Sequence, residues 1–170
     1  MGYVHDTAMS QFVPPNQIGV SAGTWTLTVA SNVWSNDRTA GDASFTAYIP
    51  IPIPSNSVAL KGAKLVSVEF MYLIGTAAAD AFATFALYKD TFAVDGTLNS
   101  SAVVAGVTVD TAHDTSAERY AANEHRAVIT LDAPAWIDND EHYHVEAVVD
   151  CAATTVFKIF GAIINYTLRV

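Results

Sequence analysis

Residues 44–56 read SFTAYIPIPIPSN, and this stretch decides the class of fold. Its apolar residues occupy alternate positions, as in a β-strand with one buried face: Phe45, Ala47, Ile49, Ile51 and Ile53. Pro50, Pro52 and Pro54 lie between and after the isoleucines, and proline has no backbone N–H for a sheet ladder. Because successive N–H groups of an extended strand point to opposite edges, these prolines block one edge and leave the other free to pair. The stretch therefore predicts an edge strand with an apolar face on the core.

Other β-signals recur along the whole chain, with Gly, Pro, Asn, Asp and Ser between them. Seven more strands are expected, at residues 23–30, 63–75, 82–90, 102–110, 126–132, 142–151 and 155–170. Residues 63–75 are apolar on both faces, which favours a central strand. Asp95-Gly96 predicts a two-residue hairpin turn, and the polar residues 111–125 predict a short helix or a long loop.

Eight short strands in one chain of 170 residues predict an all-β fold, a single-domain antiparallel β-sandwich. An eight-stranded jelly roll is the most natural version, because the connections at 31–43, 54–62 and 111–125 are long enough to cross between sheets. An eight-stranded up-and-down barrel is the second candidate. Residues 1–20 lack periodicity and contain Pro14-Pro15, so we expect an extended N-terminal arm outside a sandwich domain of residues 21–170.

Composition excludes several classes of partner. The chain carries 8 Lys and Arg against 17 Asp and Glu, a formal net charge of −9, so neither nucleic acid nor an anionic membrane is an expected partner. No apolar run reaches the roughly 20 residues of a membrane span, and the first 37 residues hold no Lys or Arg, so no secretion signal is expected. Cys151 is the single cysteine; its apolar neighbours predict a buried, unreactive thiol.

The stretch EHYHVE at 141–146 has the strongest chemical character. On a strand, His142, His144 and Glu146 share one face, and this set resembles part of the cupin metal motif. It departs from that motif, since the cupin Glu lies further from the second His and a third His follows on a later strand. A solvated outer face is the simpler interpretation. No metal ligand, cofactor site or catalytic residue is therefore predicted, and the protein is not expected to be an enzyme.

Two other patterns are interpreted as local structure. HDT occurs twice, at residues 5–7 and 113–115, but neighbouring His and Asp side chains point to opposite sides of an extended chain, so turn and capping roles are expected. Asp138, Asp140 and Glu141 fall in a turn between strands and lack the EF-hand spacing.

As a whole, the chain resembles small β-sandwich structural proteins of tailed bacteriophages, the decoration or cement proteins of capsids. The likeness rests on the start MGYVHDTAMSQFVPP, on GTWTLT, and on RTAGDASFTAYIPIPIP. It implies a non-enzymatic virion protein, assembled in the host cytoplasm, that forms homotrimers and binds a capsid or other particle protein. The residues expected at subunit contacts are Tyr3, Met9, Phe12, Val13, Pro50, Pro52 and Pro54.

Two alternatives stay open. One is a carbohydrate-binding β-sandwich module, for which the discriminating feature is an exposed coplanar row formed by Trp25, Trp34 or Trp136. The other is a cupin-like metal-binding protein that uses His142, His144 and Glu146.

Overall fold

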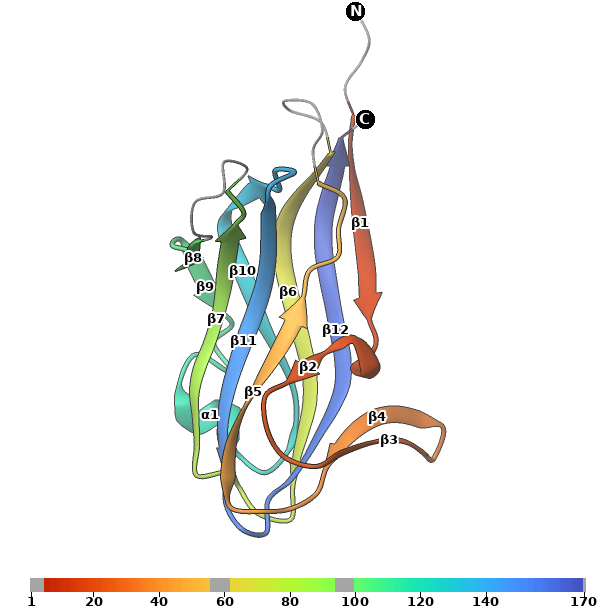
Figure 1. Ribbon diagram of the computed structural model, residues 1–170, viewed down its shortest axis with the longest axis vertical. Coiled ribbons are helices and arrows are strands. Elements are labelled where there is room, and N and C mark those ends of the chain that lie inside the picture. The colour runs from red at the N-terminus through yellow and green to blue at the C-terminus, as the bar shows by residue number, and fades with distance from the viewer. Residues whose placement is uncertain (1–4, 56–61, 94–99, 170) are drawn as a thin grey trace, which may run out of the picture.

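The computed structural model describes residues 5–55, 62–93 and 100–169, and within them two antiparallel sheets pack face to face (Figure 1). The seven-stranded sheet contains β3 (Trp25–Ala30), β4 (Val33–Arg38), β12 (Val156–Arg169), β6 (Gly62–Gly75), β10 (Glu124–Trp136) and β9 (Val107–Val109) in this order, with β1 (Asp6–Val13) also paired to β12. The five-stranded sheet contains β2 (Gly19–Val20), β5 (Ala43–Pro50), β11 (Glu141–Cys151), β7 (Ala81–Thr91) and β8 (Ser100–Val103) in this order. A 3₁₀ turn, η1 (Pro15–Gln17), and a short helix, α1 (Ser116–Tyr120), complete the elements.

The predicted all-β sandwich is confirmed, with more strands than the eight expected. Strands β1, β2 and β4 were not predicted, and residues 102–110 form β8 and β9 in different sheets instead of one strand. The chain turns at Gly106, whose φ of +70° favours glycine. The Asp95-Gly96 turn lies outside the described residues. Among those described, no helix is long and apolar enough to cross a membrane.

The proline-rich stretch follows the predicted orientation. Ile49, Ile51 and Ile53 are buried, and the N–H of Ile51 donates to the Tyr143 carbonyl on β11 at 3.2 Å. Strand β5 itself ends at Pro50, so it is shorter than the 44–53 expected, because the following prolines cannot continue a ladder on their side. On that side β5 pairs with the two-residue β2, at Ala47 and Tyr48. The predicted edge position is therefore wrong by one short strand, because the edge of this sheet is β2.

The expected arm at residues 1–20 is wrong for residues 6–20, which belong to the sandwich. Strand β1 pairs with the C-terminal half of β12, from Asp6 opposite Arg169 to Val13 opposite Ala162. Gly161 permits this approach: its φ is +133°, and an added Cβ would lie 2.7 Å from both the Phe12 ring and the Val13 carbonyl. This segment lacks periodicity because β1 lies at the edge of the sheet, where most of its residues are exposed on both faces of the strand.

The core lies between the sheets and is rich in aromatic rings. Phe45 of β5 and Phe157 of β12 meet edge to face with centroids 5.0 Å apart, and Tyr72 of β6 stacks on Phe157 at 5.3 Å. Strand β6 is central, with β12 on one side and β10 on the other, as its two apolar faces predict. This packing covers the inner face of the five-stranded sheet, and its outer face carries other side chains.

The segment 111–125 contains the five-residue helix α1, which is the first of the two predicted alternatives, a short helix or a long loop. Thr115 caps the helix: its hydroxyl accepts from the N–H of Glu118, and the Glu118 carboxylate accepts from the N–H of Thr115. The second HDT therefore has the expected capping role. The same expectation is wrong for the first HDT, because Asp6 and Thr7 belong to strand β1 and Asp6 pairs with Arg169 at 2.5 Å.

Candidate functional site

The outer face of the five-stranded sheet carries a mixed aromatic and polar surface. In β5, β7 and β11 alternate residues point into the core, and the residues between them point outward. Pairing places His144 of β11 between Pro50 of β5 and Tyr88 of β7. One step along, Glu146 lies opposite Tyr48 of β5. The antiparallel register thus gathers side chains that are distant in sequence.

This surface is hollowed next to β5. The hollow has a volume of about 370 Å³ and is lined by Gln17, Tyr48, Pro50, His142 and His144. Tyr48 is 41% exposed, a large fraction for an aromatic side chain, and its ring lies 6.3 Å from the His144 ring. The ring of Tyr88 stacks on His144 at 5.5 Å with only 12° between the planes. An open aromatic ring therefore stands beside an immobilised imidazole.

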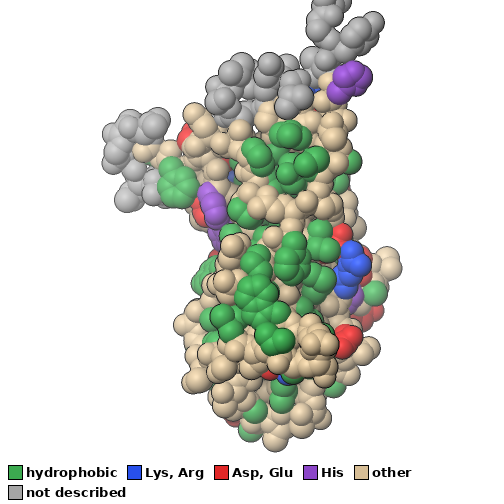
Figure 2. All heavy atoms as spheres, turned by 90° about the vertical axis from the view of Figure 1, so that its right-hand side faces the viewer, with side chains coloured by type: hydrophobic (Ala, Val, Ile, Leu, Met, Phe, Trp, Pro, Cys, Tyr) green, Lys and Arg blue, Asp and Glu red, His purple; other side chains and the backbone are tan. Residues whose placement is uncertain are grey.

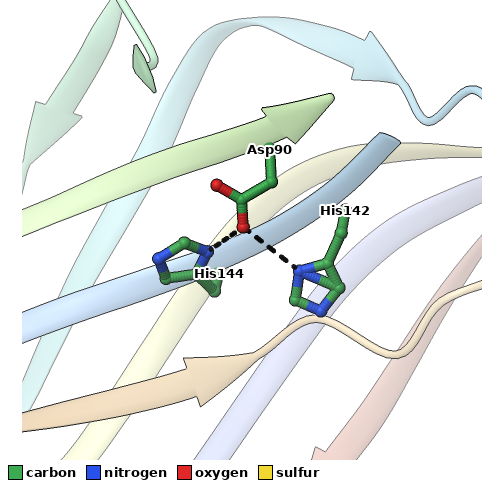
Figure 3. A group of neighbouring side chains, drawn as sticks. All are labelled: Asp90, His142 and His144. Carbon is green, nitrogen blue, oxygen red and sulfur yellow. Dashed lines mark ion pairs between the residues drawn. The ribbon is translucent and has the colours of Figure 1, made fainter. Parts of the chain in front are cut away.

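Three potential metal ligands converge at one end of the hollow (Figure 3). Asp90 lies directly opposite His142 in the ladder of β7 and β11. Its Oδ2 lies 3.1 Å from Nδ1 of His144 and 3.8 Å from Nδ1 of His142. One ligand atom from each of the three residues lies within 4.8 Å of the others. Figure 3 shows both rings turned toward the same carboxylate oxygen.

Glu146, which the sequence placed in the metal set, lies on the opposite side of the His144 ring. Its Oε1 is 3.4 Å from Nε2 of His144, whereas Asp90 faces Nδ1. The group that the structure brings together is therefore His142, His144 and Asp90, and not the His142, His144 and Glu146 of the cupin-like alternative. Asp90 was missed because it lies 51 residues before Glu141 in the sequence, and only the register of β7 against β11 brings it to the two histidines.

A second group of histidines lies elsewhere and is closed by hydrogen bonds. His113 Nδ1 is 2.8 Å from Asp110, and its Nε2 is 3.2 Å from Nδ1 of His125. Nε2 of His125 donates to the Ala121 carbonyl at 2.8 Å. Burial lowers the pKa of His125, and the charge of His113 adds to this effect. The pKa of Asp110 is also lowered: burial opposes the shift, but hydrogen bonds from the Val128 N–H and from His113 outweigh it.

The three tryptophans do not form the row that would mark a sugar platform. Trp25 packs edge to face on Phe45 in the core, and its indole N–H donates to the Ala22 carbonyl. Trp34 lies on β4 of the other sheet and is 42% exposed. Trp136, at the end of β10, is covered by Lys64 at 4.6 Å. The exposed aromatic ring of the hollow is Tyr48, which no sequence motif marks as a site residue.

The residues expected at subunit contacts fall into different environments. Met9 and Phe12 are 41% and 52% exposed on β1, whereas Val13 is buried in the core of its own chain. Pro50 lines the hollow, Pro52 and Pro54 are exposed, and Tyr3 lies outside the described residues. Figure 2 shows hydrophobic side chains gathered on the side of the molecule that carries β1 and the β3–β4 hairpin. The homotrimer and the virion location stay predictions.

The single thiol is not part of any site. Cys151 is fully buried at the end of β11, and burial raises the pKa of its thiol. The predicted burial of Cys151 is thus confirmed.

Glu141, from the acidic turn, accepts a 2.7 Å hydrogen bond from Lys89 at the end of the β7–β11 pair.

No protein-family model and no curated protein sequence matches the chain. Solved structures with a similar fold include TmCBM61 in complex with β-1,4-galactotriose, at a TM-score of 0.39 and 10% identity, over 96% of this chain and 88% of the other. A family 11 carbohydrate-binding module from Clostridium thermocellum, in complex with a β-1,3-1,4-mixed-linked tetrasaccharide, aligns at a TM-score of 0.35 and 9% identity, over 95% and 85%.

These comparisons correct the first functional hypothesis. Both of these structures are described as carbohydrate-binding modules and neither is a capsid protein, so the capsid-decoration hypothesis is not kept. The resemblance to decoration proteins rested on composition and on short stretches that any acidic β-sandwich can share. Identities of 10% and 9% transfer no binding residue to this chain.

Proposed function

We propose that the protein is a non-catalytic module that binds a neutral oligosaccharide in the hollow on the outer face of the five-stranded sheet. The observation that carries the proposal is the pairing of an exposed Tyr48 ring with hydrogen-bonding side chains around one depression. Its volume of about 370 Å³ lies within the range of roughly 300–1,000 Å³ found for small-molecule sites.

The lining suits a sugar because a pyranose has apolar ring faces and a rim of hydroxyl groups. The exposed ring of Tyr48 offers a flat apolar surface to such a face, with its own hydroxyl at the edge. Gln17 supplies an amide that both donates and accepts, and His142 supplies ring nitrogens. A mixture of one aromatic surface and a few fixed polar groups is the usual composition of a ligand site.

The negative charge of the protein favours neutral sugars over anionic ones as ligands. The chain has a formal net charge of −9, and the carboxylates of Asp90 and Glu146 stand on the same outer face. Polyanionic glycans such as sulfated or uronic-acid chains would be repelled. Neutral glucans, galactans, mannans and xylans are therefore the class to test.

The test is a titration of the protein with neutral oligosaccharides by calorimetry, supported by gel electrophoresis through the matching polysaccharides. We expect the wild-type protein to bind at least one of them. Tyr48→Ala should weaken that binding by at least about tenfold, because a central aromatic contact commonly contributes this much. We expect no binding to sulfated or uronic-acid polysaccharides tested in parallel.

Trp34→Ala is the matched control, since Trp34 is as exposed as Tyr48 (42% against 41%) but lies on β4 of the other sheet. It should leave sugar binding unchanged. The proposal fails if no neutral glycan binds, or if Trp34→Ala abolishes binding while Tyr48→Ala does not.

A further inference from the structure

We propose that Asp90, His142 and His144 bind one divalent transition-metal ion of the zinc class. This inference goes beyond sugar binding and does not depend on it. It starts from the convergence of three side chains on adjacent strands: one ligand atom from each of Asp90, His142 and His144 lies within 4.8 Å of the other two.

The distances fit a shared coordination sphere. Zinc bonds of 2.0–2.1 Å in tetrahedral geometry place neighbouring ligands about 3.3 Å apart. The observed separations from Oδ2 of Asp90 are 3.1 Å to His144 and 3.8 Å to His142. His142 is the more exposed partner, with 45% of its side chain accessible, so there is room for the small ring rotation that would close the longer gap.

The partners of the His144 ring give an independent indication. Nε2 of His144 lies 3.4 Å from Oε1 of Glu146, and Nδ1 lies 3.1 Å from Oδ2 of Asp90. Nδ1 is buried, and it has no hydrogen-bond partner among the residues that the structure describes. A cation between the two atoms would satisfy both.

The surroundings complete the arrangement expected of a metal ligand. Metal-bound histidines usually donate their second N–H to a carboxylate, which fixes the ring, and Glu146 occupies that position for His144. Tyr88 stacks on the same ring at 5.5 Å and restricts its rotation. Two imidazoles and one carboxylate favour zinc, cobalt, nickel or copper over calcium and magnesium, which prefer oxygen ligands. Three protein ligands leave a position open.

The experiment measures metal binding alone, on the full chain without an affinity tag. Calorimetric titration with ZnCl₂ should give one ion per chain, and CaCl₂ and MgCl₂ should give no heat of binding. The double variant His142→Ala/His144→Ala should not bind zinc. Circular dichroism and thermal melting of each variant establish that it is folded.

Asp90→Asn and Glu146→Gln form a matched pair, because each removes one negative charge from the same face. Asp90→Asn removes a ligand and should weaken zinc binding by at least roughly 10–100-fold, the cost of losing even an outer-shell partner. Glu146→Gln retains an oxygen that accepts from Nε2, so its affinity should stay within about threefold of wild type.

The proposal is overturned if the wild-type protein binds no zinc, if the double histidine variant binds it equally well, or if Glu146→Gln loses as much affinity as Asp90→Asn. The first result would assign the 3.1 Å contact to an ordinary ion pair between Asp90 and a protonated His144. Tyr48→Ala separates the two functions: it should lose sugar binding and keep zinc binding.

Discussion

The chain contains two groups of one aspartate and two histidines, and they differ in how their ring nitrogens are partnered. In the closed cluster, Asp110, His113 and His125, all four ring nitrogens have hydrogen-bond partners. In the open cluster, Asp90, His142 and His144, the buried Nδ1 of His144 has no hydrogen bond within residues 5–55, 62–93 and 100–169. His142 is half exposed beside the hollow.

The contrast teaches that residue type alone does not make a site. In the closed cluster the N–H of His125 Nε2 is committed to the Ala121 carbonyl, so Nδ1 accepts from His113. Asp110 also accepts from the backbone N–H of Val128 at 2.7 Å. These hydrogen bonds hold the segment 110–125 against β10 and leave no ring nitrogen of His113 or His125 free to bind a ligand. The open cluster keeps a nitrogen that can coordinate a ligand, whereas the closed cluster stabilises the fold.

The largest difference between the two clusters should appear when the aspartate of each is replaced by alanine. Asp110→Ala leaves the Val128 N–H and His113 without an acceptor, and we expect it to lower the free energy of unfolding by about 2–3 kcal/mol. Asp90→Ala should cost less than about 1 kcal/mol, as for a polar contact with access to water. Urea unfolding of both variants provides the measurement.

The two aspartates are well matched, with side chains 29% and 24% exposed. Loss of packing therefore contributes about equally to both variants. Equal destabilisation would contradict the distinction between a structural and a ligand-binding cluster.

Acid should affect the closed cluster next most strongly. Because burial lowers the pKa of His125 below its ordinary 6.5, the unfolded chain binds a proton that the folded chain does not. Stability is therefore lost as the pH falls from 6.5 toward the lowered folded value. The lowered pKa of Asp110 adds a further loss below its ordinary 3.8.

Melting temperatures measured from pH 7.5 to pH 5 test the contribution of His125 to this loss of stability. His125→Gln should be less stable than wild type at pH 7.5, but its melting temperature should fall less steeply with acid, since the titrating ring is gone. A slope identical to that of the wild type would show that His125 does not control the acid response.

The fold could be predicted from sequence where a local pattern carries the information. The alternation of isoleucine and proline at 49–54 and the two apolar faces of 63–75 give the orientation of β5 and the central place of β6 correctly. Strand β1 could not be recognised, because its stability comes from pairing with β12, more than 140 residues away, and from the space that Gly161 leaves for Phe12.

For the same reason, the sequence could predict only those site residues that lie together on one strand. His142 and His144 share a face by simple alternation, and this was identified. Asp90 reaches them through the register of β7 against β11, and Tyr48 gains its role from the hollow beside it. Spacing along one strand favoured Glu146 as the third ligand, whereas the structure places Glu146 on the other nitrogen of His144.

The smallest effect should come from Tyr88, which holds the His144 ring by stacking. Tyr88→Leu removes a contact with centroids 5.5 Å apart and no hydrogen bond to the ring, so it should lower the free energy of unfolding by about 1 kcal/mol or less. Its effect on zinc affinity should be correspondingly small, since Glu146 still orients the imidazole. Urea unfolding and zinc titration of the same sample measure both quantities. A loss of zinc affinity as large as that of Asp90→Asn would mean that stacking, rather than the Glu146 hydrogen bond, sets the orientation of His144.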